Sequence, residues 1–89
     1  MSSHDTWVLQ INPAVFKSLK SFPKNDKFFI FETIGLLSKN PYFGDIQKMK
    51  SEHDAWRRRV GAYRIFYRIK TNIKIILVFK VERRTSTTY

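Results

Sequence analysis

The fold of this chain is decided by the sequence WRRRVGAYRIFY, residues 56–67. Successive side chains of a β-strand point to opposite faces of the sheet, so Trp56 and Val60 share one face and Arg57 and Arg59 share the other. Because Trp56 and Val60 are apolar, their face should cover a core, and the two arginines should face solvent. The Gly-Ala dipeptide that follows predicts a turn between two antiparallel strands.

The second strand of this pair is expected over residues 63–69. Its tyrosines and isoleucines alternate on one face, which leaves Arg64 and Arg68 on the other. Arg58 falls on the core face of the first strand, so its aliphatic stem must carry the guanidinium outward. If the strands pair through the turn, three arginines converge on the exposed side of the sheet: Arg57, Arg59 and Arg64.

The first half of the chain predicts a strand followed by two helices. Residues 7–11 alternate as a strand, and Asn12-Pro13 is typical of a helix start, with Asn as the cap. Phe22-Pro23 should end this short helix and open a second one, which should run to about Lys39. The apolar stripe of the second helix is expected to contain Ile30, Phe31, Ile34 and Leu37.

Two further strands complete the second half, a short one over residues 46–49 and a long one over residues 73–81. The long strand is apolar on both faces, which is typical of a central strand, and Thr71-Asn72 predicts the turn before it. The sequence therefore predicts an α+β fold in the order β-α-α-β-β-β-β. An N-terminal strand and a helical hairpin precede a four-stranded antiparallel meander, in one domain over residues 1–89.

The positive charge of this chain lies in its second half. The 89 residues carry a net charge of +10, and residues 46–89 hold five lysines and seven arginines against three acids, a balance of +9. Such a concentration attracts phosphate backbones, so we expect a polyanion as ligand, RNA first. A basic face that only keeps the protein in solution is the alternative.

Several other classes of site and location are not supported by the sequence. The absence of cysteine excludes disulfides and thiolate chemistry, and the two histidines, His4 and His53, have no partners at metal-ligand spacing. We therefore expect no metal and no cofactor. The polar first residues do not form a signal peptide, and the longest apolar run is too short to cross a bilayer, so a cytoplasmic location without membrane contact is expected.

Residues 56–67, the apolar strand after them and the C-terminal RRTSTTY (residues 83–89) together resemble the RelE/ParE toxin superfamily, the toxins of bacterial and archaeal toxin–antitoxin pairs. The resemblance implies a RelE-type toxin that cuts mRNA in the ribosomal A site and so inhibits translation. It also implies a cognate small acidic antitoxin protein. In this reaction the 2′-hydroxyl attacks the adjacent phosphate without a metal.

The resemblance also implies roles for individual residues. Arg57 and Arg59 match two basic residues before the glycine turn, and Arg64 matches a transition-state stabiliser. Arg83 matches an arginine near the leaving group, and Tyr89 matches a tyrosine that stacks on the cut nucleotide. The remaining basic residues are expected to grip RNA phosphates: Lys48, Lys50, Arg68 and Arg84.

One departure from the family pattern concerns the general base. Well-known members have lysines where this chain has Arg57 and Arg59, and arginine is effectively never deprotonated. Glu52 and Glu82 are fallback bases. Two other functions remain open on the same fold: a ParE-type inhibitor of DNA gyrase without nuclease chemistry, and a non-enzymatic relic that binds an antitoxin or RNA.

Overall fold

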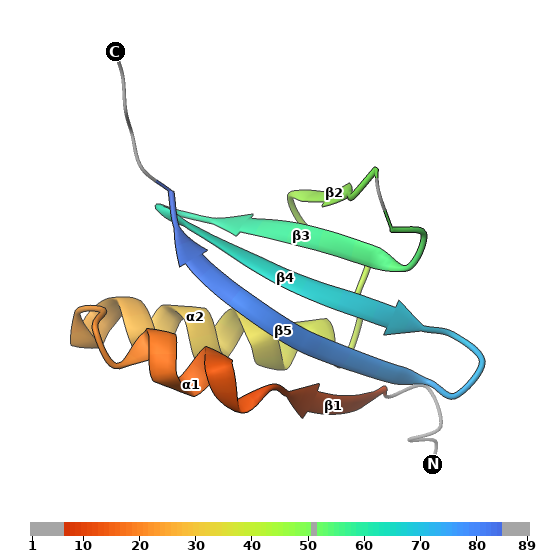
Figure 1. Cartoon of the computed structure of the whole chain (residues 1–89), viewed down its shortest axis with the longest axis horizontal. Coiled ribbons are helices and arrows are strands. Elements are labelled where there is room, and N and C mark those ends of the chain that lie inside the picture. Colours follow the sequence, from red (N-terminus) through yellow and green to blue (C-terminus); the bar gives the residue numbers. More distant parts are fainter. Residues whose placement is uncertain (1–6, 51, 85–89) are drawn as a thin grey trace.

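The helical hairpin and the sheet form two layers, with both helices on one face of the sheet (Figure 1). The computed structural model describes residues 7–50 and 52–84. The order of elements matches the α+β order expected from the sequence. The elements are β1 (Val8–Ile11), α1 (Pro13–Leu19), α2 (Lys24–Leu37), β2 (Ile46–Lys48), β3 (Ala55–Val60), β4 (Tyr63–Lys70) and β5 (Ile75–Arg83).

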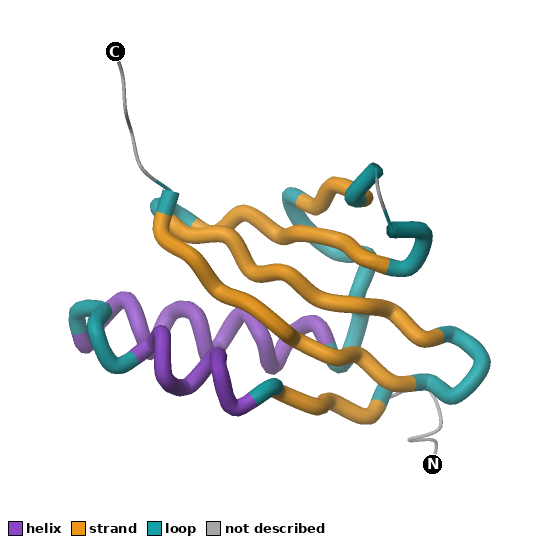
Figure 2. Tube along the Cα trace, viewed as in Figure 1, coloured by secondary structure: helices purple, strands orange, loops and turns teal. Residues whose placement is uncertain are grey.

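The sheet has the strand order β1-β5-β4-β3-β2, so β4 is its central strand (Figure 2). The four strands from β2 to β5 form the expected antiparallel meander. The pairing of β1 was not predicted: it runs parallel to β5, with Val8 opposite Ile75. The two helices connect β1 to β2, which lies at the opposite edge of the sheet, and the meander then brings β5 back beside β1.

The start of the first helix is as the sequence predicts. The Asn12 side chain accepts a hydrogen bond from the Ala14 N–H at 2.9 Å, and Pro13 occupies the first helical position, where a missing N–H costs nothing. The second helix begins at Lys24, directly after Pro23, and ends at Leu37, two residues before the expected Lys39.

The core lies between the helices and the sheet. Ile30, Ile34 and Leu37 of α2 pack there with the inward side chains of β4, which are all buried as predicted: Tyr63, Ile65, Tyr67 and Ile69. Phe31 was wrongly placed on this stripe. Its side chain is 40% exposed and packs against Phe16 of α1, with 6.0 Å between ring centroids, because residue 31 lies on the flank of the helix.

The last strand begins two residues later than predicted. Ile73 is exposed and belongs to the turn, and Lys74 has a φ of 57°, which takes it out of extended geometry. Further along, the register shifts at Phe66/Tyr67, so that Tyr67 pairs with Val78 and Phe66 with Lys80. This bulge lets Val78 and Val81, three residues apart, both point into the core.

Candidate functional site

Three arginines meet on the face of the sheet that the helices leave open. Arg59 and Arg64 are direct partners on β3 and β4, and Arg57 lies two residues before Arg59 on the same face. Together with Asp45 and Gln47 from the β2 side, they line a pocket of about 60 Å³. Guanidiniums line most of this small hollow, so it suits phosphate oxygens.

Among the described residues, each arginine of the pocket has a polar side-chain partner. Arg57 Nη2 donates to Gln47 Oε1 at 2.6 Å, Arg59 Nε lies 3.3 Å from Asp45 Oδ2, and Arg64 Nη1 lies 3.6 Å from Glu82 Oε2. Exposed pairs of this kind contribute at most about 1 kcal/mol, so the guanidiniums can exchange these partners for a phosphate.

Four charged residues form one row, from the residue before β2 across β3, β4 and β5. The Arg59 N–H donates to the Asp45 carbonyl oxygen at 2.9 Å, Arg59 pairs with Arg64, and Arg64 pairs with Glu82. We call Asp45, Arg59, Arg64 and Glu82 the charged row. Two neighbouring arginines repel one another, and a carboxylate at each end relieves that repulsion. A bound phosphate between the arginines would relieve it further.

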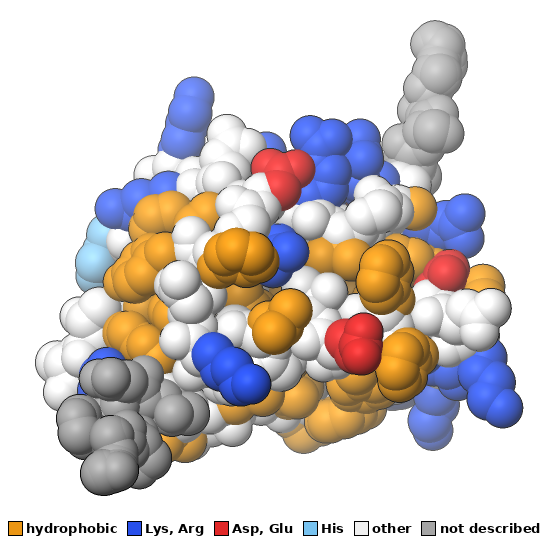
Figure 3. Space-filling view, turned by 180° about the vertical axis from the view of Figure 1, so that it is seen from behind, with side chains coloured by type: hydrophobic (Ala, Val, Ile, Leu, Met, Phe, Trp, Pro, Cys, Tyr) orange, Lys and Arg blue, Asp and Glu red, His pale blue; other side chains and the backbone are white. Residues whose placement is uncertain are grey.

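Larger hollows continue from the pocket along the edge strand β2. One of about 440 Å³ is lined by Gln47, Lys48, Met49, Lys50 and Arg57, and the next, of about 540 Å³, adds His53. Seen from the helical side, lysine and arginine side chains gather mostly along the rim of the molecule, around a face where hydrophobic patches alternate with polar surface (Figure 3). Lys48 and Lys50 therefore lie where a nucleic-acid strand that leaves the pocket would run.

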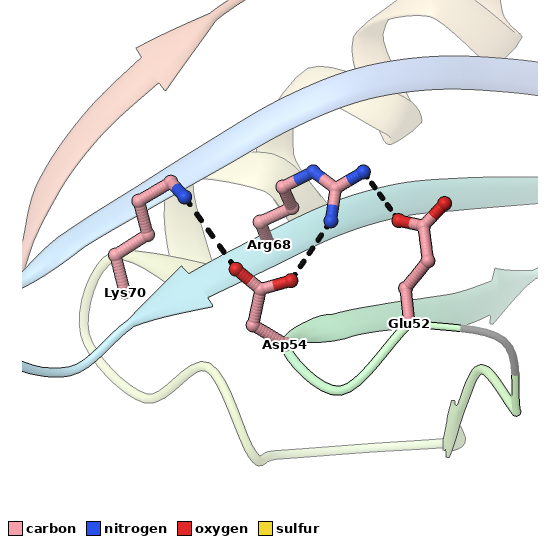
Figure 4. A network of polar contacts seen from close by, with 4 residues as sticks. All are labelled: Glu52, Asp54, Arg68 and Lys70. Atoms are coloured by element: carbon pink, nitrogen blue, oxygen red, sulfur yellow. Dashed lines mark hydrogen bonds and ion pairs between the residues drawn. The ribbon is translucent and has the colours of Figure 1, made fainter.

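Arg68 lies on the same strand as Arg64, but carboxylates hold it. Its guanidinium pairs with Glu52 and, at 2.8 Å, with Asp54, which also lies 3.4 Å from Lys70 Nζ (Figure 4). Only 29% of the Arg68 side chain is exposed. These partners occupy the donors that a phosphate would need, which argues against the expected RNA contact. They instead tie the loop before β3 to β4.

Asp54 makes this network sensitive to acid. Burial alone would raise the pKa of Asp54, but hydrogen bonds from Arg68 and Lys70 and their positive charges lower it below the ordinary 3.8. A lowered pKa in the folded state stabilises the fold above pH 3.8, and this contribution is lost as the pH falls through the folded value.

We expect Asp54→Asn to lower the free energy of unfolding at pH 7, because the amide no longer carries the charge that Arg68 and Lys70 stabilise. The difference from the parent should shrink as the pH falls below about 3.8. Urea unfolding at pH 7 and pH 3 measures this. The exposed Glu32→Gln is the control, and an Asp54→Asn deficit that stays constant with pH would contradict the assignment.

The structure does not bring Arg83 to the pocket. Arg83 pairs with Tyr63 and lies 5.8 Å from the centre of its ring, on the side of the sheet that the helices cover. The expectation that it joins the open-face group is therefore wrong for this structure. Arg84 continues the strand pairing through its N–H to the Ala62 carbonyl oxygen, at 2.6 Å. Tyr89 lies outside the described residues.

Arg58 lies on the core face, as strand alternation predicted. Its guanidinium packs beneath Gly44 and 5.7 Å from the centre of the Phe43 ring. Within the described part of the chain, its Nε and Nη1 atoms are buried without a hydrogen-bond partner. The expectation that the stem carries the guanidinium outward is therefore wrong: these atoms stay buried and the guanidinium packs near the Phe43 ring, so Arg58 serves packing and not the open face.

Asp45 and Gln47 are the pocket residues that the sequence analysis missed. Asp45 directly precedes the three-residue strand β2, and Gln47 is its middle residue. Their alternation would have placed them beside Arg59 and Arg57 had the pairing of β2 with β3 been known. Residues 7–50 and 52–84 contain no group of three or more His, Cys, Asp or Glu that could hold a metal. None of the described helices is long and apolar enough to cross a membrane.

Known proteins share both this sequence pattern and this fold. Residues 10–87 match the family described as the ParE toxin of the type II toxin–antitoxin system parDE. The curated RelE1 protein of Methanocaldococcus jannaschii is 30% identical over 79 residues, which cover 85% of this chain and 88% of that protein.

Solved structures agree with the sequence comparison. The archaeal RelE–RelB complex from Pyrococcus horikoshii OT3 matches with a TM-score of 0.79 and 28% identity over 92% of this chain and 99% of that one. The isolated RelE toxin of E. coli shares the fold alone, with a TM-score of 0.76 and 12% identity over 91% and 87%. This chain therefore belongs to the RelE/ParE superfamily of toxins from type II toxin–antitoxin systems.

Proposed function

We propose that this toxin is an endoribonuclease that cuts mRNA in the ribosomal A site and so stops translation. The observation that carries the proposal is the convergence of Arg57, Arg59 and Arg64 around one pocket on the open face of the sheet. Guanidiniums keep their charge at every physiological pH, and each can bind a phosphate through two parallel N–H···O hydrogen bonds. They suit a reaction whose transition state gains negative charge on phosphorus oxygens.

The proposed reaction is an attack by the ribose 2′-hydroxyl on the adjacent phosphate, which yields a 2′,3′-cyclic phosphate and a free 5′-hydroxyl. Arg57 and Arg59 would hold the phosphate, and Arg64 would stabilise the added charge. By family resemblance, Tyr89 would stack on the cut nucleotide. Arg83 faces the helices and not the pocket, so the three pocket arginines carry the proposal.

The surroundings of the pocket support an RNA substrate. Lys48 and Lys50 line the hollows along β2, and Arg84 lies beyond the end of β5, next to the turn between β3 and β4. These side chains would hold the backbone of the message or of ribosomal RNA in the cytoplasm. The same basic surface suits the acidic antitoxin, which would neutralise it and block access.

The test is to induce the chain in bacteria and to map the 5′ ends of mRNA. We expect cuts in phase with codons for the parent and for Lys20→Ala, which removes one positive charge from the helical layer. Arg57→Ala should lose most cuts, because removal of a charge-stabilising donor typically lowers such rates by about 10²–10³-fold. Unchanged mRNA in cells arrested by the parent would overturn the proposal.

Inhibition of DNA gyrase is the second candidate, because the matching family is described by the ParE toxin. The same induction experiment separates the two functions. Breaks in DNA and an SOS response, together with intact mRNA, would support the gyrase function and reject the nuclease. Codon-phased cuts without DNA breaks support the nuclease.

A further inference from the structure

The proposed cleavage lacks a residue for one of its steps. The attacking 2′-hydroxyl must lose its proton as its oxygen approaches phosphorus, and a side chain that accepts the proton typically speeds such a step about 10²–10⁴-fold. The three arginines of the pocket cannot do this, because a guanidinium stays protonated. A carboxylate can, since in its ionised form it only accepts hydrogen bonds and protons.

Most carboxylates among the described residues either pair with groups outside the pocket or lie in the helical layer. Glu52, a fallback base from the sequence, and Asp54 both hold Arg68. Asp26 accepts a hydrogen bond from the Tyr63 hydroxyl at 2.6 Å, on the side of the helices. Glu32 is exposed on α2, in the helical layer. The two that remain, Asp45 and Glu82, are the ends of the charged row.

The two ends of the charged row differ in their surroundings. Glu82 is held between two cations, 3.6 Å from Arg64 Nη1 and 3.3 Å from Lys80 Nζ, and does not line the pocket. Asp45 lines the pocket itself and contacts one cation, Arg59 Nε, through Oδ2 at 3.3 Å. Its side chain is 68% exposed, so a substrate can reach it. The structure therefore favours Asp45 over Glu82 as the proton acceptor.

The backbone holds Asp45 in this position. Its carbonyl oxygen accepts from the Arg59 N–H at 2.9 Å, and the Ile46 N–H donates to the Gly44 carbonyl oxygen at 3.0 Å. Gly44 has a φ of +96° and lies directly on the Arg58 guanidinium. The hydrogen bond from Arg59 and the packing of Gly44 on Arg58 thus fix the segment before β2. A carboxylate that is fixed beside its reaction partner needs little reorganisation.

We propose that Asp45 is the proton acceptor for the 2′-hydroxyl, an inference that rests on the proposed nuclease function. The O–H bond of the hydroxyl breaks and its proton passes to the Asp45 carboxylate, while the 2′-oxygen forms a bond to phosphorus. The bond from phosphorus to the 5′-oxygen breaks, and that oxygen takes a proton from solvent water. Arg59 keeps the carboxylate oriented and stays protonated throughout.

Single-turnover cleavage on ribosomes that carry mRNA in the A site tests this role. Asp45→Asn keeps size and shape but cannot accept the proton, so its cleavage rate should fall by about 100-fold or more. Asp45→Glu should recover part of that rate. Binding is measured separately, with mRNA that has a 2′-deoxyribose at the cut position. Loss of a negative charge should leave that binding equal or tighter.

This pair of measurements distinguishes a proton acceptor from a counter-ion. If Asp45 only relieved the repulsion between Arg59 and Arg64, Asp45→Asn would cleave at least as fast as the parent, and that result would overturn the proposal. Equal losses for Asp45→Asn and Glu82→Gln would overturn it as well. Glu32→Gln on α2 should match the parent. If the parent itself leaves mRNA intact, the nuclease function fails and the role of Asp45 falls with it.

Discussion

A toxin with Arg64→Ala is expected to cut ribosome-bound mRNA about 10²–10³-fold more slowly than the parent. Arg64 lies between Arg59 and Glu82 in the charged row and lines the pocket, so its guanidinium adjoins the place where a phosphate would bind. Its ion pair with Glu82 is partly exposed, and the free energy of unfolding should change by less than about 1 kcal/mol. Single-turnover cleavage and urea unfolding measure the two effects.

Arg68→Ala is the matched control, because Arg68 lies on the same strand and the same face. Its guanidinium is held by Glu52 and Asp54, so its removal should lower the free energy of unfolding by about 1–2 kcal/mol and leave cleavage nearly unchanged. Arg64→Ala should therefore affect mainly cleavage, and Arg68→Ala mainly stability. A large loss of cleavage with Arg68→Ala, or none with Arg64→Ala, would contradict the position of the site.

The fold was predictable from the sequence because local signals agreed with one another. Asn12-Pro13 marks a helix start, and the alternation of residues 56–67 fixes which side chains of two strands face the core. The same alternation predicts from the sequence alone that Arg57, Arg59 and Arg64 lie together. Phe31 and Ile73 were misplaced, because hydrophobicity does not reveal which apolar residues lie on a helix flank or in a turn.

The parts of the site that escaped prediction depend on tertiary pairing. Nothing local shows that Asp45 lies beside Arg59, because the sequence does not reveal the register in which β2 pairs with β3. Arg68 and Arg64 look alike in sequence, and only the position of Glu52 and Asp54 separates them. Strand alternation could have placed Arg83 on the same face as the buried Val81, but its family role suggested the open face.

Gly44→Ala is expected to destabilise the toxin by about 2–3 kcal/mol. Gly44 has a φ of +96°, a conformation that residues with a Cβ rarely adopt, and the added Cβ would overlap the Arg58 guanidinium. Because Asp45 follows Gly44 directly, cleavage should fall too. Urea unfolding and single-turnover cleavage measure both effects.

Gly35→Ala adds the same methyl group but should change the free energy of unfolding in the opposite direction. Gly35 lies within α2 with nothing within 4 Å of an added Cβ, so alanine should stabilise the helix by about 0.5–1 kcal/mol. The two causes of the Gly44 effect separate in an Arg58→Ala background, which removes the steric overlap and leaves the backbone strain. There, Gly44→Ala should cost less than in the parent. An equal cost in both backgrounds would assign the whole effect to backbone conformation and would show that Arg58 does not fix the chain before Asp45.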